Sequence, residues 1–323
     1  MTCTRVSNLP QEAGRIYDHL NPTVLDKPAY LMNVPFSLSA EVPNNIWMTE
    51  MKQEARRIDI NKAINQFLQL YHYMASDALV YLLPTPRVEG LQDLVYSANI
   101  GVMLEHTQDK NTVVLSNFKT SVRRPETEIG RTFFTSMGYQ VVDPPWFFEG
   151  DAELKHLHGN VYVGGFGIRS DRRAYEWMRD EYQMQIIELE ETEPYLYHLD
   201  CTVFPLTREE TLVCTEMYTP EEIKRLETVT NIVDVSVDDC FSGICNSVRL
   251  GNSILNASNI HEMKSTDEYY EDEKHKNRTL EDIAVRYAFE VSFFNLSEFM
   301  KSGALLSCMV MHLNRKSFDI SLT

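Results

Sequence analysis

Short apolar runs alternate with helical patterns along most of the chain, and together they predict a repeated mixture of strands and helices. Apolar runs four to ten residues long predict strands at 29–36, 78–84, 101–105, 111–118, 140–145, 161–169, 186–190, 197–206, 211–216 and 231–237. Apolar positions at helical spacing predict helices at 51–74, 126–139, 171–183 and 220–229. The chain is therefore expected to be an α/β protein.

The spacing of these elements predicts a module of about 50–60 residues that is repeated along the chain. Plain alternation of one strand and one helix favours a doubly wound parallel sheet. Adjacent strand pairs, such as 101–105 with 111–118, argue against that fold. Repeated mixed units instead indicate a radial, pseudo-symmetric arrangement, with functional residues at strand ends near one axis.

Two segments depart from the repeat. Residues 1–25 form a polar lead-in, and residues 26–323 are expected to be a single domain. Within that domain, 261–286 is dense in charges of both signs and poor in apolar residues. We expect a solvated helix or a charged insertion there, with a lid or an oligomer contact as the alternative.

Composition narrows the class of protein. The chain has 323 residues, 43% of them hydrophobic, with a net charge of −17. No run of Lys and Arg suggests binding to nucleic acid or an anionic membrane. No apolar run approaches the roughly 20 residues that span a bilayer, and the start lacks the apolar core of a signal peptide. Six scattered cysteines are typical of free thiols, so a cytoplasmic enzyme is expected.

The cysteines are the first candidates for chemistry. Cys201 and Cys214 lie in apolar strand patterns, and Cys240 and Cys245 flank a glycine turn without the second pair of a zinc site. Cys308 follows SGALLS and precedes MVMHL, where a small-residue turn enters a strand. A nucleophilic thiol needs a base or cation nearby, and spacing alone does not choose among the six.

Acidic side chains and a histidine are the other candidates. In YHLDCTVFPL, alternation along a strand puts His198 and Asp200 on one face. Either the two side chains hydrogen-bond each other in a purely structural role, or His198 is an acid/base and Asp200 beside it binds a positive charge. In FFEGD, Glu149 and Asp151 stand two residues apart, which fits either a site or a turn.

Taken in order, these segments resemble the guanidino-group-modifying superfamily, which includes arginine deiminases, dimethylarginine dimethylaminohydrolases, amidinotransferases and arginine dihydrolases. The resemblance covers about 26–315 and implies an α/β propeller (pentein) of five ββαβ modules. The matching segments are VPNNIWM (42–48), GLQDLVYSANIGVML (90–104), VRRPETE (122–128), FFEGDAEL (147–154), GGFGIRSD (164–171), YHLDCTVFPL (197–206) and SGALLSCMVMHL (302–313).

The resemblance implies catalytic roles for three residues. Cys308 is implied as the nucleophile that forms a covalent thiouronium adduct, His198 as the acid/base and Glu149 as the group that orients it. Asp200 is implied to accept hydrogen bonds from the guanidinium. The Phe-Glu-Gly motif has one glycine fewer than usual before Asp151.

Further residues are implied to bind substrate. Asn45 and Asn99 match polar positions of the family, and Arg169 is implied to bind the α-carboxylate. A second carboxylate ligand is implied at Arg123 or Arg124, which stand side by side and compete for the role. The expected partner is a small molecule, arginine or a derivative, with no cofactor or metal. The sequence leaves open whether the chain forms a homo-oligomer.

Position 99 bears on the reaction. Deiminases and dimethylarginine hydrolases place an aspartate where this chain has Asn99, and an amide can hold a neutral ureido group as well as a cation. The resemblance implies that this pattern, with Asn45, marks arginine dihydrolases, which convert arginine to ornithine, ammonia and carbon dioxide. The alternatives are arginine deimination, dimethylarginine hydrolysis, amidino transfer, or an arginine-binding module without catalysis.

Overall fold

Residues 21–319 are described by a computed structural model, and they form five three-stranded sheets. In each sheet the middle strand pairs antiparallel with one neighbour and parallel with the other, and a helix joins the parallel pair. The mixed α/β class and the paired strands predicted from sequence are confirmed. Most of the expected lead-in, residues 1–20, lies outside the described residues, as do 320–323.

The five sheets share this ββαβ topology. Their strands are β3 (Gly101–Met103), β4 (Thr112–Leu115) and β5 (Gln140–Val142); β6 (Leu154–His158), β7 (Val161–Phe166) and β8 (Gln185–Glu190); β9 (Val203–Pro205), β10 (Glu210–Val213) and β11 (Asn231–Asp234); β12 (Val248–Leu250), β13 (Ser253–Ala257) and β14 (Glu290–Phe294); and β15 (Met311–His312), β1 (Ala29–Asn33) and β2 (Leu79–Leu83).

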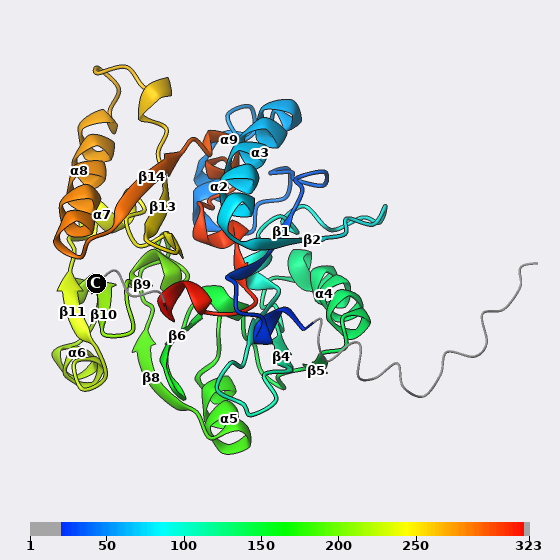
Figure 1. Cartoon of the computed structure of the whole chain (residues 1–323). Helices are drawn as coiled ribbons and strands as arrows, with labels where there is room; N and C mark the ends of the chain where they lie inside the picture. Colours follow the sequence, from blue (N-terminus) through cyan, green and yellow to red (C-terminus); the bar gives the residue numbers. More distant parts are fainter. Residues whose placement is uncertain (1–20, 320–323) are drawn as a thin grey trace, which may run out of the picture.

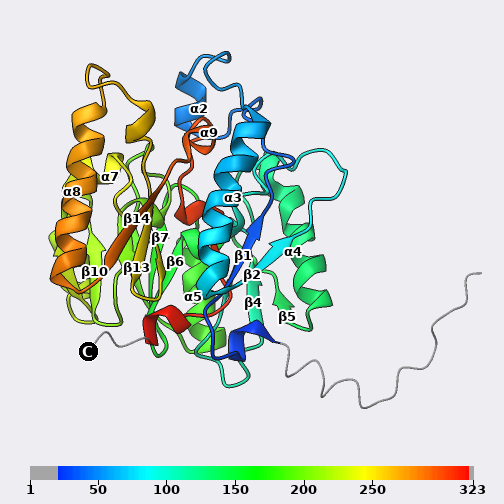
Figure 2. The same cartoon turned by 45° about the horizontal axis from the view of Figure 1, so that its top comes forward.

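The joining helices lie around the outside of the molecule (Figure 1). They are α4 (Arg124–Ser136), α5 (Arg172–Tyr182), α6 (Pro220–Leu226), α8 (Tyr270–Arg286) and α3 (Ile60–Asp77). Three shorter helices, α2 (Ile46–Glu50), α7 (Val237–Phe241) and α9 (Ser297–Met300), stand towards one end, at the top of Figure 2. None of the helices in residues 21–319 has the length and apolarity needed to cross a membrane.

Capping residues explain where these helices begin. Pro220 opens α6, and Thr219 and Glu222 form a reciprocal capping box there. The helix predicted at 51–74 begins later than expected, at Ile60, because Asp59 accepts a hydrogen bond from the third residue of α3.

The charged segment at 261–286 differs from the expected insertion. Its larger part is α8, which occupies the joining-helix position between β13 and β14. Leu280, Ile283 and Ala284 are buried against the neighbouring sheets. Glu273 and Lys276 are buried as well and form an ion pair at 3.0 Å, while the other charged residues of α8 are exposed or half-buried. The few apolar residues are therefore enough to define one packed stripe.

The segment predicted as one strand at 197–206 contains a turn. Residues Leu199–Cys201 form a 3-10 helix, η5, and β9 starts only at Val203. His198 and Asp200 therefore enter the sheet from a turn rather than from one face of a strand. The same arrangement occurs at η2 (Ser97–Asn99) before β3, η4 (Gly150–Ala152) before β6 and η8 (Ser307–Met309) before β15.

These turns meet at the centre of the molecule. η2 contacts both η4 and η8, although they come from distant parts of the chain. The fifth sheet completes this arrangement because β15 pairs antiparallel with β1, with Tyr30 opposite His312. The Asn314 side chain fastens this junction, accepting from Ala29 N at 3.1 Å and donating to the carbonyl oxygens of Pro22 and Lys27 at 2.9 and 2.8 Å.

Asn314→Ala is expected to lower the free energy of unfolding by about 2–3 kcal/mol, because three backbone groups, those of Ala29 and Pro22 in buried residues, lose their partner. Urea unfolding followed by circular dichroism measures the change. Lys274→Ala, which removes a surface ion pair with Glu271 and a contact with the Tyr270 ring, is the control and should change stability by less than about 0.5 kcal/mol. Equal effects would contradict the role given to Asn314.

Candidate active site

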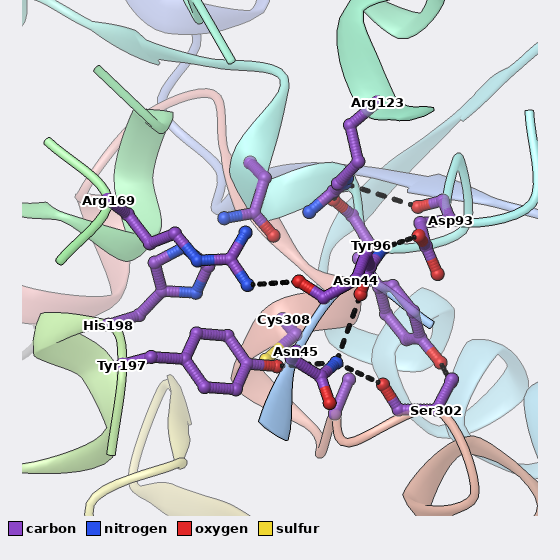
Figure 3. A pocket seen from close by; sticks show the side chains of 12 residues that line it. Asn44, Asn45, Asp93, Tyr96, Arg123, Arg169, Tyr197, His198, Ser302 and Cys308 are labelled. Atoms are coloured by element: carbon purple, nitrogen blue, oxygen red, sulfur yellow. Dashed lines mark hydrogen bonds between the residues drawn. The ribbon is translucent and has the colours of Figure 1, made fainter. Parts of the chain in front are cut away.

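A narrow polar pocket lies where the turns converge (Figure 3). It brings together side chains from segments that precede the first strands of several sheets and from the loops beside them. Its lining residues are Asn44, Asn45, Asp93, Tyr96, Asn99, Arg123, Arg169, Tyr197, His198, Ser302, Ala304 and Cys308. Six of these twelve residues were predicted from the sequence, namely Asn45, Asn99, Arg123, Arg169, His198 and Cys308, and the other six were not.

Glu149 lies fully buried behind His198. Its Oε2 is 2.8 Å from His198 Nε2 and 3.6 Å from Arg169 Nη1. Burial by itself raises the pKa of Glu149, but the charges of Arg169, His198 and Arg123 outweigh it and lower that pKa to about 2. The carboxylate is therefore ionised at neutral pH and fixes the orientation of the His198 ring.

Cys308 is the second residue of η8 and contacts a carboxylate and an amide. Its Sγ is 3.8 Å from Asp200 Oδ2 and 3.6 Å from Asn246 Nδ2. Ser307 Oγ donates to the same Asp200 oxygen at 2.6 Å, which holds η5 and η8 together. Burial and the Asp200 charge raise the pKa of Cys308 to about 12, so the thiol is protonated in the free protein at neutral pH.

The two predicted asparagines make structural contacts as well as lining the pocket. Asn45 caps α2 by accepting from Met48 N at 2.9 Å, and it donates to Ser302 O at 2.9 Å. A Cβ on Gly303, whose φ is +77°, would lie 2.9 Å from Asn45 Oδ1, so glycine is required there. Asn99 donates to the Glu149 backbone oxygen at 3.2 Å.

The structure separates the two competing arginines. Arg123 lines the pocket, is buried, and forms an ion pair with Glu126 at 2.7 Å. Arg124 lies outside the pocket and donates to the backbone oxygens of Phe118 and Lys119. Arg123, with Arg169, is therefore the one placed to meet an anion in the pocket.

Several pocket residues were not predicted from sequence. The most notable is Asp93, a buried carboxyl that accepts hydrogen bonds from Asn44 and Gln92 and whose pKa burial raises. It stands in GLQDL, a segment already matched to the family, so the resemblance could have identified it as a site residue. Tyr96, Tyr197 and the other lining residues belong to common apolar or polar patterns and carried no separate signal.

A second chamber adjoins the polar pocket at Tyr197, His198, Ala304 and Cys308. It encloses about 130 Å³ and its walls are mostly apolar. The residues that give it this character are Trp47, Tyr195, Leu196, Phe241, Met300 and Leu305.

Within residues 21–319, no group of three or more His, Cys, Asp or Glu side chains is arranged to hold a metal ion.

The chain is similar in sequence to enzymes of arginine chemistry. It is 25% identical to the bifunctional arginine dihydrolase/ornithine cyclodeaminase AgrE of Nostoc sp. over 90% of this chain, and it spans 38% of AgrE. It is 27% identical to the N(G),N(G)-dimethylarginine dimethylaminohydrolase of Mycobacterium tuberculosis over 53% of each chain.

The fold is also similar to that of a solved relative. The N-terminal domain of ArgZ, a cyanobacterial arginine dihydrolase solved bound to product, matches with a TM-score of 0.76 at 22% identity, over 89% of this chain and 97% of that one.

A family model described as N,N dimethylarginine dimethylhydrolase, eukaryotic, matches residues 34–315. The chain therefore belongs to this family, a branch of the guanidino-group-modifying enzymes whose members hydrolyse guanidino C–N bonds.

Proposed function

We propose that the protein is an arginine dihydrolase, which converts arginine and two waters to ornithine, two molecules of ammonia and carbon dioxide. The observation that carries the proposal is one buried pocket holding a thiol beside a carboxylate, a histidine fixed by a second carboxylate, and a neutral amide, Asn99. The similarity to AgrE supports the two-step reaction over simple deimination.

The charges of the pocket suggest how arginine binds. Arg169 and Arg123 present guanidinium groups suited to the α-carboxylate. Asp93 is a carboxyl suited to the α-ammonium, and Asp200 is one suited to the substrate guanidinium. This order puts the guanidinium carbon next to Cys308 Sγ, which lies 3.8 Å from Asp200.

The first hydrolysis follows from these positions. The bound cation beside Asp200 offsets the charge that raises the pKa of Cys308, so the thiol passes its proton to His198 and the thiolate attacks the guanidinium carbon. His198 donates a proton to the departing nitrogen, which leaves as ammonia. His198 then takes a proton from water, the water attacks the thiouronium carbon, and the Cys308 thiolate leaves from a ureido product.

The second hydrolysis repeats these roles on the ureido carbon. Cys308 attacks, a second ammonia leaves, and water releases a carbamate that decomposes to ornithine and carbon dioxide. Asn99 supports this step because an amide both donates and accepts, so it tolerates the neutral ureido group where a second carboxylate would favour only a cation.

Three finer features belong to the same proposal. The five sheets act as blades of a propeller, an arrangement that their shared topology and the convergence of their entry turns support. The substrate is a free small molecule rather than a residue in a polymer, because the pocket is narrow and buried. The free thiols of the described cysteines support a cytoplasmic location.

Incubation with arginine followed by mass spectrometry tests the proposal. Ornithine is expected without accumulation of citrulline, and Cys308→Ser is expected to lose at least about a thousandfold in turnover while keeping its fold. Cys214→Ser, at a buried cysteine outside the pocket, is the control. Citrulline as the end product would contradict the dihydrolase reaction, and no product at all would contradict hydrolysis of arginine.

Asp200→Asn should change thiol reactivity and turnover in opposite directions. Removing the charge lowers the pKa of Cys308, so iodoacetamide should alkylate it several-fold faster at pH 8. Turnover should fall because the guanidinium loses its partner. Mass spectrometry locates the label, and Asp77→Asn, at an exposed site, serves as the control. Unchanged alkylation would refute the effect assigned to Asp200.

Dimethylarginine hydrolysis is the second candidate, and the apolar chamber favours it. The chamber adjoins His198 and Cys308, where the leaving nitrogen departs, so methyl groups on that nitrogen fit its walls. Met300, 39% exposed at the chamber wall, allows a test. If dimethylarginine is turned over, Met300→Trp should lower its kcat/KM at least about tenfold while leaving that for arginine unchanged. Equal losses on both substrates would rule out this use of the chamber.

A further inference from the structure

Two buried carboxyl groups lie behind the His198–Glu149 pair without a cation of their own. Glu153 precedes β6 and is fully buried, and Glu191 follows β8 and is 7% exposed. No N–H or hydroxyl donor within residues 21–319 bonds to either oxygen of Glu191, whose carboxyl lies beside that of Glu153. The nearby ion pairs, Arg169 and His198 with Glu149, include neither residue.

The two carboxyl groups face the same glycine. A Cβ on Gly165 would lie 2.8 Å from Glu191 Oε1 and 2.9 Å from Glu153 Oε2. The missing side chain at position 165 therefore makes the space in which both acids sit. Tyr175 cannot serve as their donor, because its hydroxyl already donates to the backbone oxygens of Gly165 and Glu153 at 2.6 and 3.0 Å.

Adjacent buried carboxyl groups cannot both ionise without a large cost in free energy. Burial raises the pKa of Glu153 to about 7, and burial together with the charge of Glu153 raises that of Glu191 well above its usual range. Among the groups of residues 21–319 that interact with the pair, the one basic group is His198, which Glu149 already holds. The facing groups are Glu149, His198, Asp200, Cys201, Tyr175 and Tyr218.

Glu153 also connects both turns that carry the predicted acid/base machinery. Its Oε1 accepts from Ser170 Oγ at 3.1 Å, and that hydroxyl oxygen accepts from Glu149 N at 3.2 Å. Its Oε2 accepts from Leu199 N at 3.2 Å, in the residue between His198 and Asp200. A displacement of Glu153 would therefore move the backbone of Glu149 and of η5 together.

We propose that Glu153 and Glu191 form an acid pair that shares one proton and positions the His198–Glu149 pair, so that loss of this proton uncouples the two turns. With the proton in place, a hydrogen bond between the two carboxyl groups holds Glu153 against Ser170 and Leu199. Without it, two like charges repel across Gly165 and the two turns loosen. The pair is a positioning element and does not touch substrate. Its activity readout rests on the proposed hydrolase function.

The first test measures stability, which does not depend on the substrate. A carboxyl whose pKa is raised on folding stabilises the fold below its unfolded pKa of about 4.5 and loses that contribution as pH rises through about 7. The thermal unfolding midpoint of the wild type should therefore fall between pH 5 and pH 8. The unfolding midpoint of Glu191→Gln, whose side chain has the same shape and cannot ionise, should fall markedly less over this pH range.

The second test measures kcat/KM against pH. The pair gives up the first of its two protons near pH 7 and the last one at a higher pH, because burial and the charge of Glu153 raise the pKa of Glu191 well above its usual range. The wild type should lose activity when the last proton leaves, and Glu191→Gln should keep it to a pH at least about one unit higher, because the amide donates to Glu153 at every pH. Glu191→Ala should lose activity at every pH, since it removes the group at position 191 that holds Glu153 against Ser170 and Leu199. Glu190→Gln, at the exposed neighbouring residue, is the control and should match the wild type.

The outcomes separate the two ideas. If Glu191→Gln and the wild type share one pH dependence of unfolding and of kcat/KM, the acid pair is wrong. If no guanidino substrate is turned over by the wild type, the proposed function is wrong, and the unfolding experiment still decides on the pair.

Discussion

A charged carboxylate held away from water is the constraint on which the site depends. Glu149 is fully buried, and an ion in that position is tolerated only with close partners of opposite charge. Arg169 and His198 supply them, and both are themselves fixed. Arg169 donates to Asn44 O at 2.8 Å and lies 4.7 Å above the Tyr197 ring. Removing any member leaves the others with an uncompensated buried charge.

The repeat explains why residues so far apart in sequence meet. Cys308 and Asp200 are both the second residue of a 3-10 turn, and Glu149 and His198 each stand directly before such a turn. The same 3-10 turn thus recurs before the first strand of several sheets, with different side chains in each turn. The shared geometry brings the chemistry to one point, and the sequence of each copy decides whether it offers a thiol, a base or a carboxylate.

Much of this could be predicted from sequence, because apolar periodicity reveals the paired strands and the joining helices. The turn before β9 could not be predicted, because the apolar residues Leu199 and Val203 stand at the alternating positions that a continuous strand through Asp200 would also have. The choice of Arg123 over Arg124 depends on which side chain a helix start directs inward. Asp93 was missed because one acidic residue in an apolar segment resembles a turn.

The junction of β15 with β1 has a consequence for how the protein is made. β1 emerges early, with one edge unpaired, and its partner strand follows only after all four other sheets. Cys308 stands just before β15, so the pairing of β15 with β1 and the arrival of the proposed nucleophile are a single late event. A chain interrupted during synthesis therefore lacks the proposed nucleophile, and the open edge of β1 is a place where other chains can add and aggregate.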